Sequence, residues 1–272
     1  MDTSSIAFIG AGNMASSLIG GLVQKGCQKK NIYISDPSTE QRQRLVSEYG
    51  VNECQSNSEA VLQADVLVLA VKPQVMSIVL EDIKNAVNQK SILIISIAAG
   101  VPLAMFSGVL GDKTAVVRCM PNTPSLVGAG ATGMMANPAV SQNQKVLAEQ
   151  ILGAVGLALW VDSEAQIDAV TALSGSGPAY FFLLMESMIT AGESLGLDTE
   201  TAKQLTLQTA LGAATMAQQS DVSPATLRQR VTSPGGTTEQ ALRTFEEGGF
   251  QSLVGAALDA AEKRSKELAA LS

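Results

Sequence analysis

Three stretches of the sequence combine glycines with hydroxyl side chains in a way that suits the binding of anions. They read GAGNMA at residues 10–15, LSGSGPAY at 173–180 and VTSPGGTTEQAL at 231–242. Glycines let backbone N–H groups converge on a ligand, and the first turn of a helix leaves its N–H groups without intrahelical acceptors. None of the three supplies a strong base. We therefore expect them to hold anionic groups and to donate hydrogen bonds.

The first stretch fits the G-x-G-x-x-A form of the dinucleotide fingerprint. Gly10 permits the tight turn after a strand, Gly12 lets a pyrophosphate approach the backbone, and the small Ala15 lets the next helix pack on the sheet. A lone motif of this kind is a weak signal. Its place between an N-terminal strand and a helix, with a second strand ending at the usual interval, favours a dinucleotide site.

The second strand ends in ISDPS at residues 34–38, which places Ser35 and Asp36 beside the adenosine ribose. An acidic residue there accepts hydrogen bonds from ribose hydroxyls and repels a 2′-phosphate, whereas a serine with a donor neighbour can hold that phosphate. Both residue types are present, so these residues leave the choice between NADH and NADPH open. Asp36 could also be an ordinary turn residue before Pro37.

Two further strand ends, AVKP at 70–73 and AAG at 98–100, fall at the edge where open α/β sheets bind ligands. Lys72 could steady the coenzyme or simply be solvated in a loop, and Pro73 could start the next helix.

The two C-terminal stretches each have a structural interpretation as well. LSGSGPAY could be a tight loop with capping serines, with Pro178 in the first turn of a helix, and Thr237 and Gln240 match a capping box. Taken together in an otherwise apolar helical region, they favour a carboxylate site. The anion at residues 233–238 is then a substrate carboxylate, because the N-terminal turn already accounts for the coenzyme's phosphates.

The elements that must position these residues change character along the chain. Short runs rich in Val and Ile alternate with helical stretches in the first half, which predicts a parallel, doubly wound, Rossmann-type sheet. The expected strands lie at 6–10, 32–35, 66–71, 92–98 and 115–120, and those at 131–137 and 157–162 complete the sheet.

Beyond residue 163 the strand signal stops. Residues 178–197 and 201–219 predict two buried helices, and a helix of mixed charge is expected over about 250–271. We therefore expect an α/β chain with a dinucleotide-binding domain at 1–163 and an all-α substrate-binding and dimerisation domain at 164–272. The apolar helices indicate a homo-oligomer.

Composition excludes several classes of function. The formal net charge of −7 opposes binding to nucleic acid or to anionic membranes, and we see no apolar run near the length of a membrane span. Histidine is absent, so we expect no metal site and no Ser-His or Cys-His nucleophile. Three cysteines without CxxC spacing indicate reduced, buried thiols in a cytoplasmic protein.

Six motifs stand in the order and at the approximate spacing seen in pyrroline-5-carboxylate reductases, and the sequence resembles that family over essentially its whole length. They are FIGAGNMA, AVKP, SIAAGV, RCMPNTP, SGSGPAY and SPGGTTEQAL. The resemblance implies NAD(P)H-dependent reduction of 1-pyrroline-5-carboxylate to L-proline, the last step of proline biosynthesis. It also implies a homodimer through the helical domain, which in this family is often assembled into a larger ring.

The resemblance also implies roles for individual positions. Thr238 would hydrogen-bond the ring nitrogen as the catalytic residue. The carboxylate site would comprise Ser176, Ser233, Gly235, Gly236, Thr237 and Thr238, and the coenzyme site would comprise Gly10, Gly12, Asn13, Met14, Ser35, Asn57, Ala70, Val71, Lys72, Pro73, Ile97, Ala98 and Ala99. The family commonly prefers NADPH, and Asp36 is the departure that keeps NADH possible.

Two alternatives remain. One is another imine or hydroxyacid reductase with a helical second domain. Hydroxyacid enzymes of this kind use a lysine and asparagine spaced K-x-x-N, a pattern that this sequence lacks. The other is a nucleotide-sensing, non-enzymatic dimer, which would be expected to have lost the substrate loop while keeping the coenzyme loop; both loops are whole here.

Overall fold

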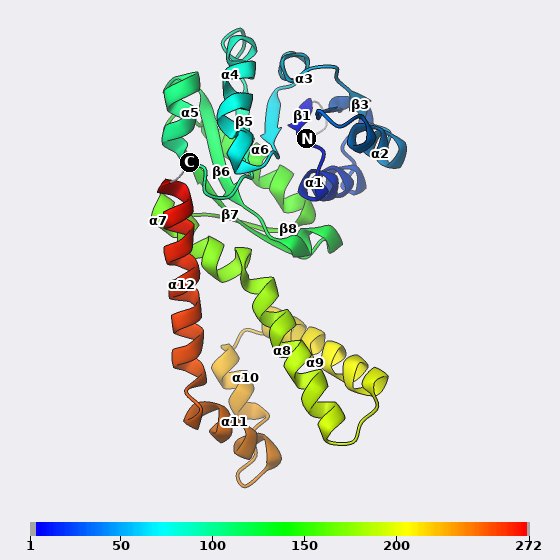
Figure 1. The fold of residues 1–272 in the computed structure, drawn as a ribbon, viewed down its shortest axis with the longest axis vertical. Helices are drawn as coiled ribbons and strands as arrows, with labels where there is room; N and C mark the ends of the chain where they lie inside the picture. The colour runs from blue at the N-terminus through cyan, green and yellow to red at the C-terminus, as the bar shows by residue number, and fades with distance from the viewer. Residues whose placement is uncertain (1–3, 271–272) are drawn as a thin grey trace. The chain divides into compact units, whose positions relative to one another are not determined.

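A computed structural model describes residues 4–270 of the 272-residue chain. Its contacts divide the chain into two compact units (Figure 1). The first contains the residues up to Ser176 together with the segment from Ala261 onward, and the second is Gly177–Ala260. The expected functional division after residue 163 stays a prediction.

The first unit contains one eight-stranded sheet with the order β3-β2-β1-β4-β5-β6-β7-β8. Chain order reverses between β1 and β4, which is the topological switch point where sheets of this kind bind ligands. The strands are β1 Ile6–Ile9, β2 Ile32–Ser35, β3 Asn52–Glu53, β4 Val66–Leu69, β5 Leu93–Ser96, β6 Ala115–Met120, β7 Gly130–Ala136 and β8 Gly156–Trp160.

Helices cover both faces of this sheet (Figure 1). Along β1, Ile6 and Phe8 belong to one buried cluster while Ala7 and Ile9 belong to the other, as the two-residue period of a strand requires. The first cluster packs under α1 Asn13–Gln24, α2 Thr39–Tyr49 and α6 Gln142–Leu152; the second packs under α3 Asn57–Gln63, α4 Met76–Val87 and α5 Leu103–Leu110. The expected doubly wound architecture is confirmed.

One strand departs from the expected parallel arrangement. β7 pairs antiparallel with β6, with Val117 opposite Ala136, whereas all the other neighbouring strands are parallel. The connection between them holds only the short 3-10 helix η3 Thr123–Val127. A parallel pair needs a crossover of a dozen or more residues, so this connection is too short to return the chain to the other end of the sheet.

The longest helix spans Glu164–Ser194 and contains a turn of π-helix. It consists of α7 Glu164–Val170, the π-helical turn Thr171–Gly175 and α8 Gly177–Ser194. By length and composition it could cross a membrane, contrary to our expectation that no segment approaches that length. A single helix of this kind is weak evidence, because apolar helices in oligomer interfaces have the same composition.

A fully buried arginine fixes the start of this helix in the first unit. Arg118 on β6 pairs with Glu164 at 3.1 Å, and the same carboxylate oxygen accepts the Leu103 N–H at 2.7 Å. Asp168, one turn further on, accepts a buried hydrogen bond from Ser265 at 2.7 Å. This bond ties the C-terminal part of α12 Phe250–Ala270 to α7.

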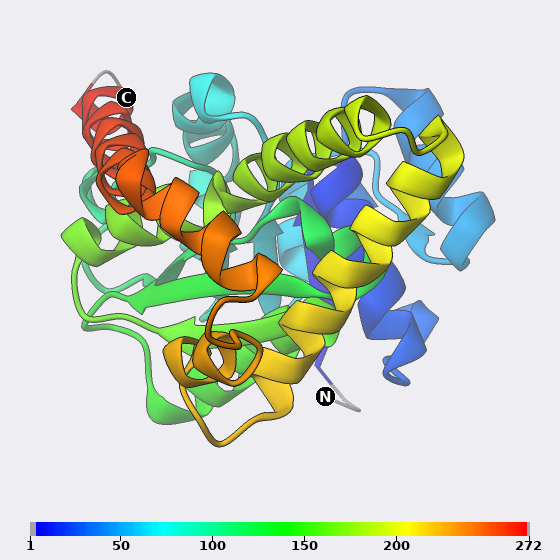
Figure 2. The same cartoon turned by 90° about the horizontal axis from the view of Figure 1, so that it is seen from below.

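The second unit is entirely helical among its described residues. It contains α8, α9 Thr199–Gln219, α10 Pro224–Arg230, α11 Thr237–Glu247 and the first part of α12. α8 and α9 pack against each other, and Figure 2 shows them as the yellow-green and yellow helices joined by a short connection. Gly192 permits this contact, since a Cβ there would meet the Ala202 side chain at 3.3 Å.

The two helices that we expected to be buried are mostly exposed in a single chain. Phe181, Phe182 and Leu183 on α8 are 64%, 62% and 63% exposed, and Leu211 and Met216 on α9 are also exposed. The prediction that these helices are apolar is therefore correct, and the prediction that they are buried within one chain is wrong. Apolar surface of this extent is typical of an oligomer interface.

Candidate functional site

A cleft of about 710 Å³ opens in the first unit beside the carboxyl ends of β1, β2 and β4. It brings together more than half of the residues that we expected to hold a dinucleotide: Gly10, Gly12, Ser35, Asp36, Asn57, Ala70, Val71 and Lys72. The others lie outside its wall, namely Asn13, Met14, Pro73, Ile97, Ala98 and Ala99. Arg42 and Asp82 line the cleft without having been expected there.

The glycine turn after β1 has the geometry that a bound pyrophosphate requires. Gly10 has a φ of +100°, and a Cβ there would lie 2.6 Å from the Ala70 carbonyl oxygen, so only glycine fits. Gly12 is the N-cap of α1, and a Cβ there would have no heavy atom within 4 Å, which leaves its backbone open to a ligand. These features fit a dinucleotide phosphate at the helix start.

Asp36 is engaged by the backbone on both sides of its carboxylate. One oxygen accepts the Ala11 N–H at 2.8 Å, and the other accepts the Ser38 N–H at 2.8 Å. The first bond ties the end of β2 to the glycine turn, and the second is the local turn bond that an Asp before Pro37 was expected to make. Asp36 therefore holds two backbone N–H groups while it lines the cleft.

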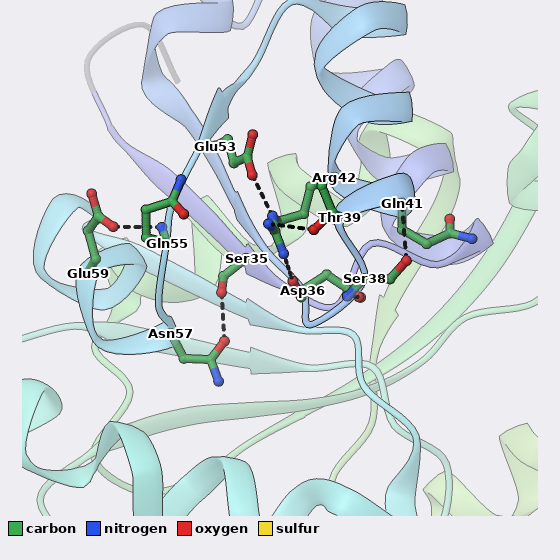
Figure 3. Close-up of polar contacts among 10 residues, drawn as sticks. All are labelled: Ser35, Asp36, Ser38, Thr39, Gln41, Arg42, Glu53, Gln55, Asn57 and Glu59. Atoms are coloured by element: carbon green, nitrogen blue, oxygen red, sulfur yellow. Dashed lines mark hydrogen bonds and ion pairs between the residues drawn. The ribbon is translucent and has the colours of Figure 1, made fainter.

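Arg42 is the guanidinium in the wall of the cleft, and each of its three nitrogens makes one hydrogen bond (Figure 3). Its Nε donates to Glu53 at 2.6 Å, one terminal nitrogen donates to the Asp36 carbonyl, and the other donates to Thr39 at 3.2 Å. Ser35, at the end of β2, donates from its hydroxyl to the Asn57 side-chain oxygen at 2.8 Å. Ser35 and Asn57 are thus adjacent, as their shared expected role requires.

Pro178 lies in the first turn of α8, as we expected, but the residues before it form a π-helical turn instead of a loop. Residues 171–175 form the π-helical turn inside a continuous helix, so the Ser176 N–H donates to the Thr171 carbonyl at 2.9 Å. Pro178 has no N–H and would leave the Ser174 carbonyl unsatisfied; Asn122 of the RCMPNTP motif donates to it at 2.9 Å. The π-turn accommodates this proline, and turns of this kind are frequent at functional sites.

The loop before α11 is a tight turn that presents backbone N–H groups. Gly236 N–H donates to the Ser233 carbonyl at 3.0 Å, and Gly235 has a φ of +70°. Proline followed by glycine at the centre of such a turn is typical of type II. Thr237 and Thr238 then form the first helical residues, whose N–H groups have no intrahelical acceptor.

The expected capping box at this loop is wrong by one residue. α11 begins at Thr237 with Gly236 as its N-cap, and neither Thr237 nor Gln240 makes a capping bond. Instead Glu239 reaches back and accepts the Gly235 N–H at 2.7 Å. The reason is that Thr237 is already the first helical residue. The side chain that can reach back to the turn is then that of the third helical residue, which is Glu239.

The two helices that begin at these glycine turns lack the side-chain caps found elsewhere. Serine or aspartate side chains cap six helices of the described part of the chain, namely α2, α3, α6, α7, α9 and α10. No side chain at the N-cap caps α1 or α11. The same is true of α4, which continues directly from the 3-10 turn Pro73–Val75, and of α5, whose first N–H donates to Glu164, so among these four helices only α1 and α11 combine an uncapped start with a glycine turn. A helix start without a cap leaves N–H groups and the positive end of the helix dipole for a ligand.

The three cysteines are buried, as expected, and they do not belong to the cleft wall. Burial raises the pKa of Cys54 to about 11, and it raises the pKa of Cys119 further. Thiolate nucleophiles are therefore not part of this site. Within residues 4–270 no group of three Cys, Asp or Glu side chains could hold a metal ion.

The doubly wound sheet with a glycine turn at its switch point defines a dinucleotide-dependent oxidoreductase. Residues 5–100 match the family model described as NADP oxidoreductase, coenzyme F420-dependent. Residues 164–268 match the model described as pyrroline-5-carboxylate reductase dimerisation.

Relatives and solved structures match the whole chain. A pyrroline-5-carboxylate reductase of Pseudomonas aeruginosa is 58% identical over 99% of this chain and 98% of its own length. The structure of a pyrroline-5-carboxylate reductase from Coxiella burnetii is 49% identical, with a TM-score of 0.95 over 98% of this chain and 99% of that one. That of the Plasmodium falciparum pyrroline carboxylate reductase, with NADP bound, is 34% identical, with a TM-score of 0.87 over 99% of both chains. The chain belongs to the pyrroline-5-carboxylate reductase family.

Proposed function

We propose that this protein reduces 1-pyrroline-5-carboxylate to L-proline with a reduced nicotinamide coenzyme, the closing step of proline biosynthesis. Membership of the family supplies the reaction. The observation in this chain that carries the proposal is the pair of uncapped helix starts, because they provide the two kinds of anion site that the reaction needs. One would hold the coenzyme's pyrophosphate, and the other would hold the substrate's carboxylate.

The coenzyme residues divide into three groups along the cleft. Gly10, Gly12, Asn13 and Met14 would face the pyrophosphate, since they form the turn and the first helical residues after β1. Ser35, Asp36 and Asn57 would face the adenosine ribose. The nicotinamide half would lie along Ala70, Val71, Lys72, Pro73, Ile97, Ala98 and Ala99, which follow the ends of β4 and β5. When bound, the coenzyme supplies a hydride from C4 of its nicotinamide; NADPH is expected, and NADH is possible.

The substrate residues would be those of the loop before α11, together with Ser176. The residues from Ser233 to Thr237 would surround the carboxylate. Because the Gly235 N–H donates to Glu239 and the Gly236 N–H donates to the Ser233 carbonyl, the donors left for it include the Thr237 N–H and the hydroxyls of Ser233 and Thr237. Thr238, half-buried in the first turn of α11, would donate its hydroxyl hydrogen bond toward the ring nitrogen.

The reaction explains why a chain without histidine can be the catalyst. In the protonated cyclic imine the carbon of the C=N bond, which becomes carbon 5 of proline, is electrophilic, and hydride addition there gives a neutral amine nitrogen. No ionising side chain has to remove a proton. The protein's contribution is then orientation, with the loop fixing the carboxylate and Thr238 directing the ring, so that the carbon faces the nicotinamide.

We further propose a homodimer formed through the helical second unit, assembled into a larger ring, and a cytoplasmic location. The exposed apolar side chains of α8 and α9 support the dimer, and a family model named for dimerisation covers residues 164–268. A chain with a net charge of −7 has little attraction to nucleic acid or to anionic lipid. Equilibrium sedimentation would establish the number of chains in the assembly.

Initial rates of coenzyme oxidation, followed by absorbance at 340 nm with pyrroline-5-carboxylate and each coenzyme in turn, test the proposal. We expect consumption that depends on the imine and saturates with it. Simple hydroxyacids with the oxidised coenzyme should give no rate, because the K-x-x-N pattern for proton removal is missing. Coenzyme binding without consumption would instead support a nucleotide-sensing protein.

A further inference from the structure

An acidic side chain from α4 reaches the adenosine end of the cleft and holds one of its binding residues. Asn57 donates from its side-chain nitrogen to Asp82 at 2.8 Å, while its side-chain oxygen accepts the Ser35 hydroxyl at 2.8 Å. Ser58 adds a hydrogen bond to the Asp82 carbonyl at 3.2 Å, which joins the start of α3 to this turn of α4. Asp82 is exposed and lines the cleft.

These contacts fix which way the Asn57 amide faces. A carboxylate only accepts hydrogen bonds, so Asp82 selects the nitrogen end of the amide and leaves the oxygen end to Ser35. One amino hydrogen of Asn57 remains for a ligand. The two hydrogens of an amino group diverge by roughly 120°, so a ligand oxygen bonded to the second one would lie about 5 Å from the Asp82 carboxylate.

The charge of Asp82 has no ion-pair partner within residues 4–270. The charge of Arg42, the guanidinium in the cleft wall, is paired with Glu53, and three of its five N–H donors are directed to Glu53, to the Asp36 carbonyl and to Thr39. The remaining cation of the wall, Lys72, is exposed, and Asp36 adds a second carboxylate. A doubly charged phosphate at Asn57 would thus meet the charge of Asp82, which no described cation neutralises.

We propose that Asp82 is a specificity-determining residue that lowers the preference for a coenzyme with a 2′-phosphate. It acts by holding Asn57 as a donor to an oxygen at the ribose 2′ position and by repelling a phosphate there. NADH can then compete with NADPH in a family in which NADPH is common. This inference rests on the proposed coenzyme site and deepens it.

The direct test is equilibrium binding of 2′,5′-ADP and 5′-AMP, measured by titration calorimetry on the full-length protein. Asp82→Asn keeps an acceptor for Asn57 and removes the charge. We expect it to tighten 2′,5′-ADP binding about three- to tenfold, the effect of one charge on a phosphate roughly 5 Å away in a solvated, salt-screened cleft. Binding of 5′-AMP should change by less than about twofold, because it carries no phosphate at that position.

Glu81→Gln is the matched control, because it removes the same charge one residue away. The Glu81 carboxylate faces Lys84 at 3.6 Å and is not part of the cleft wall. We expect no change in either affinity. Asp82→Ser is a second test variant, in which Asn57 also loses its acceptor. Affinity for 5′-AMP should then fall, while the ratio of the two affinities still moves toward 2′,5′-ADP.

Two further readouts separate this idea from a general structural effect. The ratio of kcat/KM for NADPH to that for NADH should rise in Asp82→Asn by the same factor as the binding ratio. Added salt should narrow the difference between the variant and the parent protein. If Asp82→Asn changed the affinities for 2′,5′-ADP and 5′-AMP by the same factor, the assignment of Asp82 would be overturned. The same would follow if Glu81→Gln changed the ratio of the two affinities as much as Asp82→Asn does. Failure of the proposed function would appear separately, as absent turnover of pyrroline-5-carboxylate by the parent protein.

Discussion

Replacing Gly10 by alanine should damage the coenzyme cleft more than the fold around it. Gly10 has a φ of +100°, and an added Cβ would lie 2.6 Å from the Ala70 carbonyl oxygen and 2.8 Å from its carbon. Both are backbone atoms at the end of β4, so they cannot rotate away as a side chain could. The turn between β1 and α1 must therefore move, and with it the N–H groups that we propose face the pyrophosphate.

The size of the effect follows from two costs. A left-handed backbone conformation costs a non-glycine residue about 1–2 kcal/mol. Overpacking by one carbon at a rigid position costs about 1–3 kcal/mol more. The expected loss is about 2–5 kcal/mol of unfolding free energy, which is below the roughly 5–15 kcal/mol by which proteins are usually stable. Gly10→Ala should remain folded while its coenzyme affinity falls at least about tenfold.

Gly26→Ala is the control that isolates the dihedral cost. Gly26 has a φ of +88°, and an added Cβ there would have no heavy atom within 4 Å. It should lose about 1–2 kcal/mol and bind the coenzyme normally. Urea unfolding at one protein concentration gives the free energies, and calorimetric titration gives the affinities. If Gly10→Ala were no less stable than Gly26→Ala and bound the coenzyme as tightly as the parent, the assigned close approach of β1 and β4 would be incorrect.

Three further substitutions or measurements probe the rest of the account. Thr238→Ala should lower kcat/KM by roughly ten- to several-hundredfold through the loss of an oriented hydrogen bond, and unchanged turnover would remove its assigned role. Glu239→Ala removes the hydrogen bond that ties the Gly235 N–H to α11, so the loop is held less firmly and the KM for the imine should rise about two- to tenfold with kcat nearly unchanged. Glu239→Gln keeps an acceptor for this N–H and should show the parent KM. Thiol titration of the native protein at pH 8 should be slow, because Cys27, Cys54 and Cys119 are all buried. Burial raises the pKa of Cys54 to about 11, which leaves about one molecule in a thousand as thiolate at that position. Rapid modification would show that the cysteines are not buried.

Much of the first unit could be predicted because its signals are local. The run IYIS gave β2 at Ile32–Ser35 with its observed bounds, and the other expected strands match within a few residues. β3 was missed because it has only two polar residues, Asn52 and Glu53, whose strand character comes entirely from pairing with β2. The direction of β7 was missed because it depends on the length of a connection and not on the residues of the strand.

The coenzyme cleft could be predicted only in part. Ser35 and Asn57 were expected by position, and their hydrogen bond agrees with a shared role. Asp82 could not be found from sequence, since it lies 25 residues from Asn57 and reaches it only because α3 packs against α4. Arg42 likewise faces the cleft through contacts with Glu53 that carry no local sequence signal.

The helical unit shows where a single chain misleads sequence reasoning. The apolar residues of α8 satisfy the pattern of a buried helix, yet Phe181 and Phe182 are exposed in one chain. The spacing of apolar residues predicts that a helix face is covered. It does not predict whether the same chain or another copy of the chain covers it. The π-helical turn before Pro178 was also beyond prediction, because it depends on Asn122 satisfying a carbonyl 52 residues away in the sequence.

The central claim is direct hydride transfer between two ligands that the protein orients without an ionising base. Coenzyme deuterated at the transferring position of nicotinamide C4, incubated in ordinary water with pyrroline-5-carboxylate and the protein, tests it most directly by mass spectrometry of the product. We predict proline that carries one deuterium at carbon 5. Proline without deuterium, formed while the labelled coenzyme is oxidised, would contradict the account.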